Sequence, residues 1–369
     1  MRLCCFFNYA PLYRQSIYKK IDGIFDTQFY FGEEVIDGQK SGIAKLDYSI
    51  FKNKPIESKN KIFFKKFLWC TKAAFLGFKK YDTYLVTGHF SYSYIPLILT
   101  CKFLGKRIYG WGHGLKSNNG KTRILNNFLY KNLTGFFVYG EKGKERLVSL
   151  GFNKTKIHVI YNSLTGRVTN IIDYSSDVLR NHFNNDNPVL IFVGRLMPQK
   201  KLEWLIEAHA YLQKKGIPSN LVLVGTGPQE ATLKQIALEN GYNERIWFFG
   251  ECYDDNKLSE LLYNSDLCVS PGNIGLTALH SLQYGTPALS HGNFELQGPE
   301  YETIVEGETG TLYKEGDKVD FMRTIENWLV NKTGDRNSIR QNCYAMINGK
   351  WNSDNQIRIF KEVFEGNAE

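Results

Sequence analysis

The chain has 369 residues, of which 43% are apolar and 22% are charged. Single hydrophobic cores rarely exceed about 250 to 300 residues, so this length favours two domains, and the composition excludes a largely disordered chain. No apolar run reaches the roughly 20 residues of a membrane-spanning helix, and the apolar start at residues 1–7 is too short for a signal peptide. We therefore expect a soluble protein of the cytoplasm.

The charge is unevenly distributed along the chain. Residues 1–185 contain 29 Lys and Arg against 12 Asp and Glu, whereas the whole chain has a net charge of only +9, so the remainder is acidic. This asymmetry predicts different partners for the two halves, with nucleic acid and an anionic membrane as candidates for the basic half. The seven cysteines include no Cys-x-x-Cys pair, which favours reduced thiols over disulfides or a zinc site.

The first half predicts an α/β domain over residues 1–165. Short apolar runs at 3–7, 29–31, 83–87, 107–109 and 135–139 are candidate strands, and 94–104 and 142–150 are candidate helices. The segment 157–162 closes this domain, and the polar residues 166–187 are expected to form a linker.

The second half has the clearer pattern. Apolar strands are predicted at 189–194, 221–225, 246–250, 267–271 and 287–290, with helices from about 202, 229 and 275. Strand and helix alternate with short turns, so residues 188–350 predict a second Rossmann-like domain, and 351–369 a helix that returns to the first. Since open α/β sheets bind ligands outside the carboxyl ends of their strands, we expect the active site in a cleft between the domains.

Two turns in the second half indicate a phosphorylated ligand. Arg195 follows Gly194 at the end of a strand, and Lys200 follows after a tight turn, so the two cations can converge on one anion. The alternative is a pair of solvated surface cations. Gly225 and Gly227 follow the next strand and would let the backbone approach a ligand, although such a turn alone is weak evidence.

A third strand-to-helix transition spans residues 270–277. Backbone N–H groups at the helix start near Gly275, Leu276 and Thr277 can hold a diphosphate. His280 lies one turn further on, either at this site or as a packed structural residue.

The order of these motifs resembles the retaining, nucleotide-sugar-dependent glycosyltransferases of family 4. These enzymes have the GT-B fold, in which two Rossmann-like domains face each other across a cleft. The resemblance covers residues 135–325 well and the N-terminal part loosely, and its matching segments are 138–147, 158–163, 194–200, 224–228, 248–250, 262–271, 275–287 and 302–310.

The resemblance implies roles for individual residues. Arg195 and Lys200 would hold the donor diphosphate, and His113 would lie beside the donor sugar as the third catalytic residue. The turn with Glu251 and Cys252 would lie beside the nucleobase. In the first domain, the loop with Tyr13 and Arg14 would line the acceptor and phosphate sites. The donor would carry UDP or GDP, without a cofactor or a metal ion.

The sequence departs from the family at one important place. The family usually has two glutamates eight positions apart in the helix-start segment, and here these positions are Gly272 and His280. A neutral imidazole can still bond a ribose hydroxyl, but glycine offers no carboxylate to the sugar. The longer segment 291–300 would supply the missing contacts through Asn293, Gln297 and Glu300, and Glu302 fits the family's glutamate after that turn.

Residues 61–80 are basic and aromatic at near-helical spacing. They predict an amphipathic helix that lies on an anionic membrane surface, or one that packs on the first sheet with its lysines in solvent. No nucleic-acid recognition module is visible, so nucleic acid is not an expected partner.

Together these features predict a peripheral, cytoplasmic glycosyltransferase on the inner membrane face. The family resemblance implies transfer with retention to a glycan or lipid-linked acceptor, in the assembly of capsule, O-antigen or a similar bacterial surface polysaccharide. Two alternatives stay open: a GT-B protein that binds a nucleotide-sugar without turnover, and a nucleotide-sugar epimerase.

Overall fold

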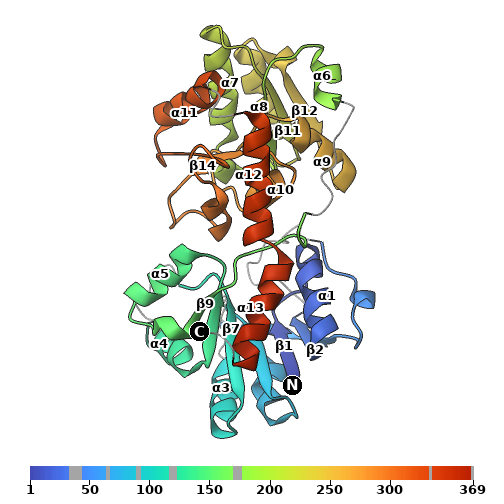
Figure 1. Cartoon of the computed structure of the whole chain (residues 1–369), viewed down its shortest axis with the longest axis vertical. Coiled ribbons are helices and arrows are strands. Elements are labelled where there is room, and N and C mark those ends of the chain that lie inside the picture. The colour runs from blue at the N-terminus through green and yellow to red at the C-terminus, as the bar shows by residue number, and fades with distance from the viewer. Residues whose placement is uncertain are drawn as a thin grey trace. The chain divides into compact units, whose positions relative to one another are not determined.

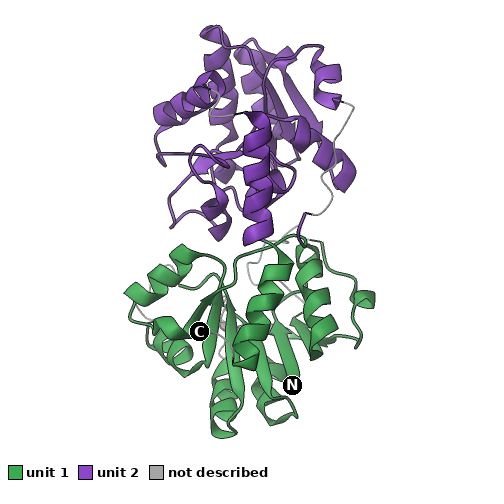
Figure 2. Ribbon diagram, viewed as in Figure 1, with its two compact units in different colours: residues 1–166, 352–369 green, residues 167–351 purple. Residues whose placement is uncertain are grey.

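The computed structural model describes residues 1–32, 44–63, 67–88, 93–115, 123–168, 177–331 and 335–366. The chain forms two compact units, residues 1–166 with 352–369 and residues 167–351 (Figures 1 and 2). Each unit is a parallel sheet with helices, which confirms the predicted α/β class. No helix in these described ranges is long and apolar enough to cross a bilayer.

The sheet of the first unit has seven parallel strands in the order β3-β2-β1-β6-β7-β8-β9. The strand order reverses between β1 and β6, which defines the topological switch point of this sheet. The strands are β1 (Arg2–Phe7), β2 (Asp26–Gly32), β3 (Ile56–Ser58), β6 (Thr83–Thr87), β7 (Arg107–Gly112), β8 (Gly135–Val138) and β9 (Ile157–Val159).

Helices cover both faces of this sheet. One face is buried under α1 (Gln15–Ile24) and the C-terminal helix α13 (Ser353–Glu365). The other face is covered by α2 (Thr71–Phe75), α3 (Tyr94–Phe103), α4 (Arg123–Asn132) and α5 (Glu141–Ser149). Because both faces are buried, the strands are apolar throughout, as in Leu3 to Phe7.

The helix predicted over residues 61–80 is wrong. β4 (Asn60–Phe63) and β5 (Phe67–Cys70) pair as an antiparallel hairpin, and helical structure begins only at Thr71. The hairpin strands consist largely of aromatic and branched residues, which favour extended backbone over helix. Residues 64–66 of the expected helix lie outside the described ranges.

The second unit has a six-stranded parallel sheet in the order β12-β11-β10-β13-β14-β15, with its switch point between β10 and β13. Its strands are β10 (Val189–Val193), β11 (Asn220–Val224), β12 (Ile246–Gly250), β13 (Leu267–Val269), β14 (Ala288–His291) and β15 (Gly310–Tyr313). Its main helices are α7 (Leu202–Lys214), α8 (Glu230–Glu239), α9 (Asp255–Asn264), α10 (Thr277–Gln283), α11 (Lys318–Asn331) and α12 (Arg336–Gly349).

Part of the range expected as a linker is helical. α6 (Val178–Phe183) begins at Asp177, whose carboxylate accepts hydrogen bonds from the backbone N–H groups of Leu179 and Arg180. Leu179 is buried against the second sheet together with residues of α9. These residues therefore belong to the core of the second unit.

Candidate functional site

The loops after β10 and β13 meet at the switch point of the second sheet. The backbone N–H of Gly272 donates to the carbonyl oxygen of Lys200 at 3.1 Å. A Cβ at position 272 would lie 2.1 Å from the carbonyl oxygen of Gln199, so no side chain fits there without a shift. The two loops therefore touch through their backbones, and the glycine that departs from the family pattern is a packing requirement.

The loops after β10 and β11 also touch through glycines. Gly194 and Gly225 have φ angles of 146° and 135°, which L-residues rarely adopt. A Cβ on Gly225 would lie 2.0 Å from the carbonyl oxygen of Gly194, and one on Gly227 would lie 2.4 Å from that of Leu196. At the carboxyl edge of the sheet, the predicted glycine turns thus pack backbone against backbone, with no side chain between them.

Arg195 and Lys200 differ in their surroundings. The side chain of Arg195 is exposed, and neither cation has an ion pair with a carboxylate in the described part of the chain. Lys200 is largely buried, and its Nζ donates to the carbonyl oxygen of Asn273 in the β13 loop. Burial lowers the pKa of the Lys200 ammonium group. Lys200 therefore connects the two loops, while Arg195 is open to an anion from solvent.

α10 begins directly after this junction. Leu276 is its N-cap, Gly275 before it has φ 53°, and the Thr277 hydroxyl donates to the carbonyl oxygen of Val193 at 3.0 Å. His280 is mostly buried, which lowers the pKa of its imidazole, and its Nδ1 has no partner among the described residues. Because Nδ1 is enclosed by the protein, a hydrogen bond with a ligand hydroxyl would have to use the other ring nitrogen, Nε2.

The segment after β14 is held in place by Gln297. Its side-chain amide donates to Ser290 Oγ at 2.8 Å and to the His291 carbonyl oxygen at 2.9 Å, and its oxygen accepts from Ile274 N at 3.0 Å. Because the amide is used inside the protein, Gln297 positions the loop, which differs from the sugar contact expected for it.

The other polar residues of this segment are distributed over its length. Asn293 Oδ1 accepts from the backbone N–H of Glu295, and Glu300 is 3% exposed in the 3₁₀ turn Pro299–Thr303, which also carries Glu302. A Cβ on Gly298 would lie 2.5 Å from Glu300 Oε2, so the carboxylate of Glu300 folds back toward the backbone of this loop.

The β12 turn brings Glu251 to the β11 turn. The Thr226 hydroxyl donates to Glu251 Oε1 at 2.5 Å, and Glu251 itself is exposed. Cys252 is half-buried next to it. The predicted nucleobase residues therefore lie at the same edge as the glycine turns.

At the carboxyl edge of the first sheet, two of the predicted residues, Arg14 and His113, contact Tyr139. Arg14 and Tyr13 lie in the 3₁₀ turn Leu12–Arg14, and the Arg14 guanidinium donates to the Tyr139 hydroxyl and lies 4.7 Å from the centroid of Trp111. The ring of His113, directly after β7, lies 5.0 Å from that of Tyr139. Tyr139 and Trp111 were missed by sequence reasoning because aromatic residues at strand ends are usually core.

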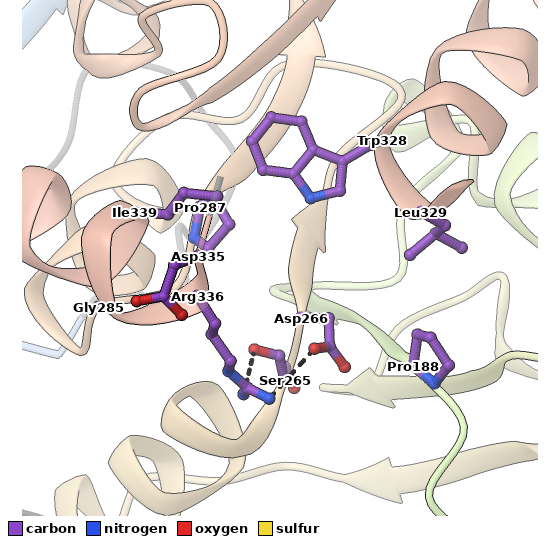
Figure 3. Close-up of a pocket in the computed structure, with 10 residues that line it drawn as sticks. All are labelled: Pro188, Ser265, Asp266, Gly285, Pro287, Trp328, Leu329, Asp335, Arg336 and Ile339. Atoms are coloured by element: carbon purple, nitrogen blue, oxygen red, sulfur yellow. Dashed lines mark hydrogen bonds and ion pairs between the residues drawn. The ribbon is translucent and has the colours of Figure 1, made fainter. Parts of the chain in front are cut away.

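A further pocket of about 390 Å³ lies at the other edge of the second sheet, and none of the predicted site residues lines it (Figure 3). Pro188, Asp266 and Pro287 line it, each just before a strand. Figure 3 shows Arg336 directed toward Asp266 and Ser265; the guanidinium donates to Asp266 Oδ1 and to the Ser265 carbonyl oxygen, both at 3.1 Å. This edge carries the amino ends of the strands, where open α/β sheets do not place their active sites.

Comparisons with known proteins find similarity to glycosyltransferases. Residues 177–346 match the family model "Glycosyl transferases group 1". EpsD of Bacillus subtilis, a glycosyltransferase by name, is 34% identical over 148 residues, which are 39% of this chain and 37% of EpsD. A GDP-mannose-dependent phosphatidylinositol dimannoside mannosyltransferase of Mycobacterium tuberculosis is 34% identical over 30% of this chain and 29% of its own length. The matches thus span only about a third of these curated relatives.

Several solved structures match this chain over nearly its whole length. HepE of Anabaena, solved in complex with UDP, has a TM-score of 0.73 at 16% identity, with 99% of this chain and 100% of HepE covered. The lipopolysaccharide outer core galactosyltransferase WaaB also has a TM-score of 0.73 at 16% identity, and both chains are covered completely. Residues 177–346 are therefore similar to the glycosyl transferases group 1, and the chain as a whole has the GT-B fold.

Proposed function

We propose that this protein is a glycosyltransferase that moves a sugar from a nucleoside-diphosphate-sugar to an acceptor. The main observation is the contact between the β10 and β13 loops. Arg195 and Lys200 lie in the β10 loop, which packs so closely against Gly272 that no side chain fits at that position. Preorganised cations stabilise the charge that develops on a departing nucleoside diphosphate. Exposed Arg195 would bind the diphosphate bidentately, and Lys200 would act as a point charge.

The donor is proposed to carry UDP or GDP, because HepE was solved with UDP and with UDP-glucose, and the mycobacterial relative is GDP-mannose-dependent by name. His280 would accept a hydrogen bond from a ribose hydroxyl, and Glu251 and Cys252 would lie beside the base. Asn293, Glu300 and Glu302 would contact the sugar. With two protein cations on the diphosphate, we propose transfer that needs no metal ion.

On the acceptor side, we propose a glycan or a lipid-linked glycan, with Tyr13, Arg14 and His113 of the first unit in contact with acceptor and sugar. Retention at the anomeric carbon and a role in bacterial surface polysaccharide assembly follow from the family resemblance. The name of WaaB, a lipopolysaccharide outer core galactosyltransferase of the same fold, supports the surface-polysaccharide role. The enzyme would then work at the cytoplasmic face of the membrane.

The test is a donor panel. Purified protein is incubated with UDP-, GDP- and dTDP-sugars and a mixture of lipid-linked and free oligosaccharide acceptors, with and without EDTA, and the released nucleoside diphosphate and the glycan product are measured. We expect product from at least one donor, unchanged by EDTA, and at least tenfold less from Arg195→Ala, with Lys214→Ala as the matched exposed control. Dependence on a divalent ion, or full activity of Arg195→Ala, would contradict the proposed diphosphate site.

The same panel of sugar donors distinguishes two other functions from glycosyl transfer. Gly272 and His280, in place of the usual glutamates, favour a protein that binds nucleotide-sugars without turnover, and this function predicts nucleotide binding with no release of diphosphate from any donor. A solved structure described as a UDP-N-acetylglucosamine 2-epimerase has a TM-score of 0.62 at 17% identity. An epimerase would change the donor sugar in the absence of any acceptor, which NMR of the donor pool detects.

A further inference from the structure

A basic pocket of about 380 Å³ lies at the amino edge of the first sheet, opposite the edge that carries Arg14 and His113. Its lining residues come from the segments where α3 and α4 lead into β7 and β8, and from the start of β9. Five of its lining residues are cationic and none is a carboxylate: Lys102, Lys106, Arg107, Lys131 and Lys156.

The cations of this pocket are oriented by neutral groups. Lys102 Nζ donates to Asn132 Oδ1 at 3.0 Å, and Lys106 Nζ donates to the carbonyl oxygen of Gly77 at 2.8 Å. Arg107 and Lys156 donate to the backbone carbonyl oxygens of Phe364 and Leu133. These bonds fix the positions of the side chains but leave their positive charge uncompensated, so the pocket is complementary to an anion.

Two carboxylates at this edge contact Arg2. Asp26 pairs with Arg2 Nε at 3.2 Å, and Asp82 accepts from the backbone N–H of Arg2 at 2.7 Å. Asp82 also lies beside the pocket, since its backbone carbonyl oxygen accepts from the backbone N–H of Arg107 at 3.1 Å. Neither carboxylate forms an ion pair with a cation of the pocket among the described residues, so the pocket keeps an excess of positive charge.

Exposed apolar side chains border the pocket. Phe103 is 88% exposed and Phe78 is 71% exposed. Their segments are in contact, since a Cβ on Gly77 would lie 2.6 Å from Thr100 Cβ of α3. Lys106, which lines the pocket, also donates to the carbonyl oxygens of Gly77 and Lys79 on both sides of Phe78. The basic pocket and the two phenyl rings thus form one surface.

We propose that this surface docks on an anionic phospholipid bilayer. The pocket would hold a lipid phosphate, and Phe78 and Phe103 would insert among the headgroups and upper acyl chains. Cations next to exposed large apolar side chains are the combination that binds anionic interfaces. A soluble phosphate would need the pocket but would gain nothing from two solvated phenyl rings, so the rings favour a lipid over a free anion. This surface retains Phe78 from the segment 61–80 expected at the membrane, but its cations come from the pocket and not from a helix over that segment.

Docking by this edge has a consequence for the acceptor, which rests on the proposed function. The six residues of β7 span about 20 Å, so the carboxyl edge of the first sheet would stand about that far from the docked edge. An acceptor anchored in the same membrane would then be a lipid-linked glycan of several sugars rather than a single lipid-linked sugar.

The test is vesicle co-sedimentation of the full chain without any sugar donor. We expect binding to vesicles of phosphatidylcholine with 30% phosphatidylglycerol, a composition chosen for the assay, and at least tenfold weaker binding to phosphatidylcholine alone. Lys102→Glu with Lys131→Glu changes two exposed side chains and should lower binding to the anionic vesicles by about 25-fold or more. Phe78→Ser with Phe103→Ser should also weaken binding at least tenfold.

Matched controls lie on the second unit. Lys214→Glu changes an exposed lysine, and Leu238→Ser changes a leucine that is 57% exposed; both should bind like the wild type. Far-UV circular dichroism and unchanged thermal midpoints exclude unfolding as a cause. The assay measures no turnover, so its result tests membrane docking independently of the proposed transferase activity.

Three results would overturn the proposal. One is the absence of binding to anionic vesicles. A second is wild-type vesicle binding by the phenylalanine variant together with saturable binding of inorganic phosphate, which would make the pocket a site for a soluble anion. The third is tighter binding of a single-stranded RNA oligomer than of vesicles, lost in the lysine variant, which would make the surface a nucleic-acid site.

Discussion

Gly272 lies against the backbone of Gln199, so close that a Cβ at position 272 would stand 2.1 Å from the Gln199 carbonyl oxygen. The contact joins the loops after β10 and β13, the two strands that flank the switch point of the second sheet. A glutamate at this position, as in the family that the sequence resembles, would require the β10 loop to move. In this chain the junction is therefore built on glycine, and sugar contacts must come from other residues.

Gly272→Ala should destabilise the second unit by about 1 to 3 kcal/mol, because the added methyl group overlaps backbone atoms that no rotamer change can move. It should also weaken nucleotide binding, since the loops that carry Arg195 and Asn273 must separate. Urea denaturation and nucleotide titration measure the two effects. Gly349→Ala, in a helix with no atom within 4 Å of the new Cβ, is the control and should be neutral or stabilising. Equal stability of the two variants would contradict the close contact.

Arg195→Ala should lower kcat/KM for the donor by about 10- to 100-fold, the range expected for the loss of a charged hydrogen-bonding partner. Its thermal midpoint should stay unchanged because the side chain is exposed. Lys200→Ala should lower both kcat/KM and stability, since it also removes the bond to the Asn273 carbonyl oxygen. Kinetics together with thermal melts distinguish these two patterns, and a destabilised Arg195→Ala would show that the guanidinium has a structural partner.

His209 should make stability depend on pH. Burial lowers the pKa of its imidazole to about 4, although a bond between Nε2 and the Ser219 carbonyl oxygen at 2.9 Å opposes the shift. The unfolded chain takes up this proton near pH 6.5 and the folded chain only near pH 4, so stability is lost as the pH falls through this window. The loss from this group is about 3 kcal/mol. Urea denaturation at several pH values should show a shallower slope for His209→Asn, and an unchanged slope would assign the pH dependence to other groups.

Tyr139→Phe should destabilise the first unit by about 1 to 2 kcal/mol, because the partly buried Arg14 guanidinium loses a hydroxyl that accepts its hydrogen bond. If Arg14 contacts the acceptor, KM for the acceptor should rise as well, with the donor KM unchanged. Tyr253→Phe removes a hydroxyl from a tyrosine that is 86% exposed and serves as the control. A stability of Tyr139→Phe equal to that of the control would mean that the hydroxyl contributes nothing to the position of Arg14.

Much of the fold can be predicted from the sequence because each buried parallel strand is apolar over most of its length. The strand predicted at 83–87 is β6, and the one predicted at 246–250 is β12, with the same bounds. The glycine turns that follow the strands of the second unit were also visible, since a glycine after an apolar run signals backbone that a side chain would block. The order of the strands within each sheet could not be predicted from the sequence, because it depends on contacts between segments that are distant in sequence.

The sequence by itself determined the α/β class and the strand-end positions of Gly194, Gly225 and Arg195, because these follow from local hydrophobic patterning and from the conformational demands of single residues. Tertiary structure alone decided three features. Residues 60–63 and 67–70 pair as antiparallel strands, since their aromatic spacing suits a helix and a strand alike and only pairing selects one. Gly272 meets Gln199, and Arg14 meets Tyr139, across 73 and 125 residues. The basic pocket likewise gathers cations from the ends of α3 and α4 and from the starts of β7 and β9, because parallel strands bring their amino ends to one edge.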